Sequence, residues 1–91
     1  MAKLVIFSKE QIEERYPIGS SLMAMNAQKA IKDGHKVALI QNYTFNNDFK
    51  EILDVCNDVL KRENPRYSVV TFVDVTDLEE EYEVVVAFKE E

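Results

Sequence analysis

Residues 67–91 read YSVVTFVDVTDLEEEYEVVVAFKEE, and this stretch decides the fold. Two runs dense in β-branched and aromatic residues, 67–76 and 82–91, are separated by the short acidic connection 77–81. Runs of this composition on either side of a short polar connection are typical of a β-hairpin. The sequence therefore predicts two long antiparallel strands at the end of the chain.

The same stretch carries most of the charge. It holds eight acids and one base and has a net charge of −7, whereas residues 1–66 hold nine acids and ten bases and carry +1. Six of these acids crowd one end of the predicted hairpin: Asp74, Asp77, Glu79, Glu80, Glu81 and Glu83. Acids within a Debye length of about 8 Å act together and steer encounters with basic surfaces. The simpler interpretation is that they keep an edge strand soluble.

Upstream of the hairpin, short apolar runs alternate with helical periodicity. The runs at 3–7 and 36–43 predict buried strands. A first helix is expected over 9–16, because Ser8 and Gln11 form a capping-box pattern. A second is expected over 22–33, capped by Ser20 or Ser21 and ended by Gly34. Its apolar stripe is predicted to be Leu22, Met25 (or Met23), Ala27, Ala30 and Ile31.

The third helix is the clearest, and Asn64-Pro65 ends it. Asn46 or Asn47 is its expected cap. Apolar residues recur along it with helical spacing: Phe49, Ile52, Leu53, Cys56, Val59 and Leu60.

The predicted order is β-α-α-β-α-β-β in a single compact domain over residues 1–91, of the α/β or α+β class. About 28 residues containing helix separate the first two strands, so these strands are expected to be parallel. With the C-terminal antiparallel hairpin they would form a four-stranded mixed sheet packed by helices.

Both faces of the hairpin are partly apolar. Simple alternation places Val69, Thr71, Val73 and Val75 on one face of the first hairpin strand, with Val70 and Phe72 on the other. Either helices cover both faces, or one face is buried by a partner or by a second copy in a homodimer.

Composition excludes several classes of protein. A chain of 91 residues with 46% apolar residues is one folded domain rather than a disordered segment. One cysteine and one histidine exclude an intramolecular disulfide and a Cys- or His-rich metal site. No apolar run suits a signal peptide or a membrane span, so a cytoplasmic location is expected. The net charge of −6 argues against direct binding of nucleic acid or of an anionic membrane.

Gly19, Ser20 and Ser21 at a helix start suggest a second kind of site. A helix N-terminus attracts anions, so these residues would hold a phosphate or a nucleotide, with Lys9, Arg15 and His35 near enough to help. No Walker or dinucleotide glycine pattern is present, and an ordinary serine cap explains the same residues.

Three further features have ordinary explanations. Cys56 lies in the apolar stripe of the third helix and is expected to act as a small core residue. His35 follows the helix-ending Gly34 and has no matched catalytic partner in the sequence. The run 79–81 lacks the spacing of a calcium loop, so no metal and no cofactor are expected.

The leading hypothesis is a non-enzymatic interaction protein whose acidic hairpin end docks on a basic surface of another protein. In size and charge alone, the chain resembles small acidic inhibitors of DNA-handling enzymes, many of them encoded by bacteriophages. No motif identifies such a family. The alternative is a small-ligand protein that uses the glycine-serine segment. An enzyme is not expected, because the overlap with a thioredoxin-like order lacks a Cys-x-x-Cys motif.

Overall fold

The computed structural model describes residues 2–43, 49–79 and 81–91. Its seven elements follow the predicted order, which is thereby confirmed. They are β1 (Lys3–Ile6), α1 (Lys9–Arg15), α2 (Leu22–Lys32), β2 (Lys36–Tyr43), α3 (Phe49–Glu63), β3 (Tyr67–Leu78) and β4 (Glu81–Glu90).

The four strands form one sheet in the order β1-β2-β4-β3, and every neighbouring pair is antiparallel. The expected parallel pairing of the first two strands is therefore wrong, and the sheet is not mixed. The helices α1 and α2 lie between β1 and β2, and together they return the chain to the end of the sheet at which β1 finishes. Phe7, just after β1, donates its backbone N–H to Val37 at the start of β2 over 3.0 Å. A single crossover helix would instead deliver the chain to the opposite end.

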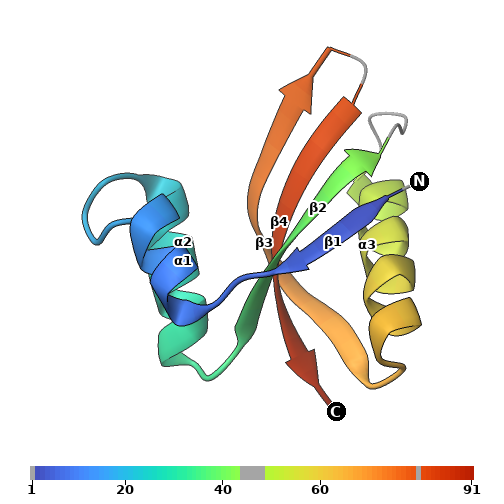
Figure 1. Cartoon of the computed structure of the whole chain (residues 1–91), viewed down its shortest axis with the longest axis horizontal. Coiled ribbons are helices and arrows are strands. Elements are labelled where there is room, and N and C mark those ends of the chain that lie inside the picture. Colours follow the sequence, from blue (N-terminus) through green and yellow to red (C-terminus); the bar gives the residue numbers. More distant parts are fainter. Residues whose placement is uncertain (1, 44–48, 80) are drawn as a thin grey trace.

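Helices cover both faces of the sheet (Figure 1). On one face, α1 and α2 pack on Val37 and Leu39 of β2 and on Val85 and Ala87 of β4. On the other, α3 packs on the alternate residues of the same strands, Ala38, Ile40, Val84, Val86 and Phe88. Helices of the same chain thus cover both faces of the hairpin, although Val70 and Leu78 stay 42% and 48% exposed. The observation that suggested a homodimer through a hairpin face is explained without one.

The two faces of β3 do not follow simple alternation. Val69, Phe72 and Val75 all pack on the α3 side, and Val73 is buried on the α1 and α2 side. The register against β4 shifts between Val69 and Thr71 and again between Phe72 and Asp74. Each shift inserts one extra residue into β3, as in a β-bulge, and reverses which residues face the core. The predicted grouping of Val69 with Thr71 and Val73 is therefore wrong.

The core face of α2 consists of alanines. Ala24, Ala27 and Ala30 are buried against the sheet, whereas Leu22 and Met25 are 67% and 63% exposed. The expected stripe is correct for Ala27, Ala30 and Ile31, which packs against the same core. It is wrong for Leu22 and for both Met25 and its alternative Met23, and it did not include Ala24. Small side chains allow the helix backbone to lie close to the sheet, and the larger residues then fall on the opposite side.

The predicted helix ends are confirmed where they lie in the described residues. Ser8 and Gln11 form a reciprocal capping box on α1. Gly34 has φ +85°, and the bonds from Gly34 to Ile31 and from His35 to Ala30 complete a Schellman motif at the end of α2. The predicted caps of α3, Asn46 and Asn47, lie outside the described residues.

Candidate interaction surface at the hairpin tip

The paired ends of β3 and β4, at Leu78 and Glu81, project beyond the helices (Figure 1). The strands stay paired up to Leu78 and Glu81, well past Val84, the last fully buried residue of β4 in that direction. We call the exposed residues at this end the hairpin tip: Asp77, Leu78, Glu79 and Glu81. Glu80, which was also predicted to bind a partner, lies outside the described residues.

The hairpin tip combines unpaired acids with one apolar side chain. Among the described residues, Asp77, Glu79 and Glu81 make no ion pair; the ion pairs found there are Arg15–Glu83 and Lys89–Glu91. Leu78 is 48% exposed between them, although it is a large aliphatic residue. The tip therefore combines the exposed side chain of Leu78 with three carboxylates that form no ion pair in the described part of the chain.

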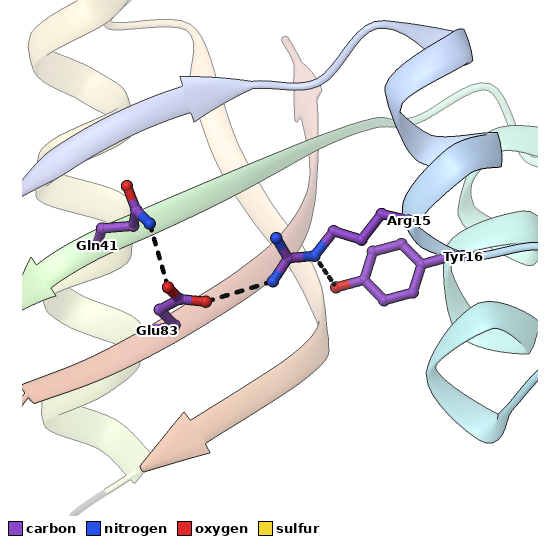
Figure 2. Close-up of polar contacts among 4 residues, drawn as sticks. All are labelled: Arg15, Tyr16, Gln41 and Glu83. Carbon is purple, nitrogen blue, oxygen red and sulfur yellow. Dashed lines mark hydrogen bonds and ion pairs between the residues drawn. The ribbon is translucent and has the colours of Figure 1, made fainter. Parts of the chain in front are cut away.

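Glu83 does not belong to this free surface. Its carboxylate accepts a hydrogen bond from Arg15 Nη2 over 3.3 Å and another from Gln41 Nε2 over 3.1 Å (Figure 2). Arg15 Nε in turn donates to the Tyr16 hydroxyl over 3.2 Å. The Glu83 side chain is 24% exposed. Both of its oxygens are occupied, so Glu83 holds the end of α1 on β4 rather than facing a partner.

Asp74 lies on the same side of the sheet as Glu83. It pairs with Val85 in register and is half-buried. Its charge acts on Tyr16, whose pKa it helps to raise. The five described acids of this group therefore fall into two sets: Asp77, Glu79 and Glu81 at the tip, and Asp74 and Glu83 near Arg15 and Tyr16.

Burial and neighbouring charges set the protonation of this network. Burial raises the pKa of the Tyr16 phenol, and Asp74 and Glu83 raise it further, while the contact with Arg15 opposes them. Burial alone would lower the pKa of Arg15, but its interactions with Tyr16 and Glu83 more than offset that effect and raise it. A charged guanidinium beside a neutral phenol is thus the stable arrangement.

Gly19, Ser20 and Ser21 of the predicted ligand site line one groove, but the three basic residues expected to assist them do not line it. The Ser21 hydroxyl accepts the backbone N–H of Ala24 over 3.0 Å and caps α2. Arg15 is bound to Glu83. Lys9 and His35 instead line a separate cavity of about 280 Å³ near the other end of α2. That helix has 11 residues and spans about 16 Å.

Gly19 and Ser20 form a turn before α2. Gly19 has φ +80°, which favours glycine, and Ser20 donates its backbone N–H to Pro17 over 3.0 Å. Both residues are exposed, and they line the wall of a shallow groove along α2 rather than an enclosed phosphate pocket.

Two other features that the sequence raised are the thiol of Cys56 and the possibility of a metal site. Cys56 is buried, and desolvation raises its pKa to about 12, so its thiol stays protonated. Within the described ranges, no three or more His, Cys, Asp or Glu side chains are placed to hold a metal ion. In the same part of the chain, no helix is both long and apolar enough to cross a membrane.

Two features escaped the sequence reasoning. Arg15 and Glu83 are 68 positions apart in the sequence, and no local sequence pattern predicts that they interact. The groove along α2 did leave a signal: the segment LMAM at 22–25 has more apolar residues than a single core-facing stripe uses.

Comparisons of the chain with protein-family models, with curated proteins and with solved structures give no match. The function is therefore inferred from the surface alone.

Proposed function

We propose that this protein is a non-enzymatic interaction protein whose hairpin tip docks on a basic surface of a partner protein. The observation that carries the proposal is the exposed Leu78 on a projecting hairpin end, flanked by three carboxylates that form no ion pair in the described part of the chain. An apolar anchor within a polar or charged rim is a common layout of an interaction hot spot.

The chemistry of the tip supports a partner with an apolar recess inside a basic surface. Leu78 suits a shallow apolar recess, and Asp77, Glu79 and Glu81 suit lysines and arginines around it. Surfaces that bind nucleic-acid phosphates have this positive character. Docking of the tip would cover such a surface, so the protein would act as an inhibitor that competes with the nucleic acid. The clustered negative charges of the tip would also attract the basic surface of the partner and so speed association at low salt.

The test compares three baits in a pull-down at low salt. The first is the wild type, and the second carries Asp77→Lys, Glu79→Lys and Glu81→Lys. The third is a matched control with Asp54→Lys, Asp58→Lys and Glu63→Lys on the exposed side of α3. Both variants raise the net charge by six, from −6 to zero, so they differ only in where the charge changes.

We expect a partner that the wild type and the α3 variant capture and that the tip variant loses. Added double-stranded DNA should release this partner, because both ligands use the same basic surface. The proposal is overturned if the tip variant and the α3 variant retain the same proteins as the wild type, or if competing DNA releases none of them.

A further inference from the structure

A second unpartnered surface lies on the outer side of α2. Leu22 and Met25 on α2 are 67% and 63% exposed, and Ile18 in the turn before the helix is 85% exposed. With the turn before the helix they line a groove of about 820 Å³. Most of this groove lies on the side of α2 away from the sheet, because Ala27 and Ala30 occupy the side that packs on it. Ala24 is buried in the same core and also contributes to the groove lining. An exposed apolar surface of this kind marks a contact site on a small protein.

The rim of this α2 groove is basic. Lys29 and Lys32 line it one and two turns beyond Met25, and Asp33 is the single acid in its lining among the described residues. Helix α2 itself contains two lysines and no acid. The surface is therefore apolar at one end and positive at the other, on a protein whose net charge is −6.

The hairpin tip of the same chain has the complementary chemistry. Leu78 offers an aliphatic side chain for the apolar end of the groove, and Asp77, Glu79 and Glu81 offer carboxylates for Lys29 and Lys32. Figure 1 shows the tip at the end of the sheet and α2 packed on one of its faces. Because the groove opens away from that sheet, a tip that fills it comes from a second molecule.

We propose that two copies of this chain associate through these surfaces, with the hairpin tip of one copy seated in the α2 groove of the other. Each copy has one tip and one groove, so the contact can be made twice in a symmetric pair. Two reciprocal contacts bury more surface than one, and a two-fold arrangement of this kind would end the assembly at a dimer. This association does not require the foreign partner proposed above, but it occupies the same tip and would compete with that partner.

The experiment uses two charge reversals and their mixture. The groove variant carries Lys29→Glu and Lys32→Glu, so that its groove and its tip are both acidic. The tip variant carries Asp77→Lys, Glu79→Lys and Glu81→Lys, so that both of its surfaces are basic. Lys3→Glu with Lys9→Glu is the control for the groove variant, and the α3 triple variant is the control for the tip variant. Circular dichroism and thermal unfolding establish that all of them fold.

Association is measured by sedimentation and light scattering up to about 1 mM, the range in which small interfaces form transient complexes. We expect the wild type and both controls to dimerise, with weaker association at high salt. Each reversal alone should weaken the dimer about tenfold or more, and an equimolar mixture of the two variants should restore it, because every tip then meets a groove of opposite charge.

Three results would overturn the proposal or its pairing of surfaces. One is a wild type that stays monomeric over the whole concentration range, which would leave the α2 groove to a foreign acidic segment. Another is a dimer that both reversals leave intact, which would place the contact between copies elsewhere. Association of the mixed variants no stronger than that of either variant alone would count against the pairing of tip and groove.

Discussion

Arg15 at the end of α1 and Glu83 in β4 lie 3.3 Å apart, between guanidinium nitrogen and carboxylate oxygen. Gln41 of β2 binds the second oxygen of the same carboxylate, and Tyr16 accepts a hydrogen bond from Arg15. The side chain of Glu83 in β4 thus connects α1 and β2 to its own strand. Because Glu83 is bound in this way, it differs from the nearby acids Asp77, Glu79 and Glu81, which form no ion pair among the described residues.

The first prediction concerns the strength of this link. Arg15→Gln and Glu83→Gln should each lower the free energy of unfolding, and the double variant should lose less than the sum of the two. The expected coupling energy is about 0.5 to 1 kcal/mol, because both side chains are partly exposed and water screens the pair. Urea unfolding of the four proteins measures it.

Glu13→Gln, on the exposed side of the same helix, is the control and should change stability by less than about 0.5 kcal/mol. The coupling should shrink in high salt. Additive losses at low salt would mean that Arg15 and Glu83 do not stabilise each other.

A second prediction follows from the raised pKa of Tyr16. An ordinary tyrosine, as in the unfolded chain, has a pKa of about 10, and the folded value is higher. Between the two values the folded state keeps a proton that the unfolded state loses. The stabilisation from the neutral phenol is therefore complete below about pH 10 and is lost as pH rises through the folded pKa.

The measurement is the free energy of unfolding from neutral to alkaline pH for the wild type and for Tyr16→Phe. Across that window the wild type should lose up to about 1.4 kcal/mol per pH unit more than the variant, the slope for one proton. The other ionisable groups contribute equally to both proteins. Parallel curves would show that Tyr16 titrates as it does in the unfolded chain.

Local patterns account for most of the fold. The order of elements, the hairpin, the capping box at Ser8 and the glycine at position 34 all depend on residues close in sequence, and all are confirmed. Hydrophobic periodicity placed Ile52, Cys56, Val59 and Leu60 on the buried side of α3 correctly. Short-range chemistry dictates such features, so a single sequence is enough to find them.

The errors concern relations between distant segments. The direction of β1 depends on how α1 and α2 return the chain, which no residue of β1 encodes. No glycine or proline marks the two extra residues in β3, so the sequence did not predict the register shifts. Simple alternation therefore placed Val73 and Val75 on the same face of the strand. Which of the described hairpin acids forms an ion pair with Arg15 depends on the position that Arg15 takes in the folded protein. Each of these is a tertiary outcome.

A third prediction tests the burial of Cys56. Its thiol, with a pKa raised by desolvation to about 12, should react with a thiol reagent at mildly alkaline pH only when the protein unfolds. The expected observation is slow modification of the native protein and immediate modification in denaturant. Because the thiol is protonated in the fold, its stabilisation is complete below about pH 9 and is lost as pH rises toward the folded value. Rapid modification of the native protein would contradict the buried position.

The fourth prediction separates helix capping from ligand binding at the start of α2. Ser21→Ala should lower the free energy of unfolding by about 1 kcal/mol, because it removes the acceptor of the Ala24 N–H. Ser20→Ala is a matched control one residue away. Ser20 takes part in the turn through its backbone N–H, so loss of its hydroxyl should cost less than about 0.5 kcal/mol.

Chemical unfolding with and without inorganic phosphate completes the comparison. A cap acts without a ligand, so the difference between the two variants should be the same in both buffers. An anion site would instead show phosphate-dependent stability that Ser20→Ala and Ser21→Ala both abolish. Equal losses in the two variants, present only with phosphate, would reject capping by Ser21 and restore the glycine-serine segment as a binding site.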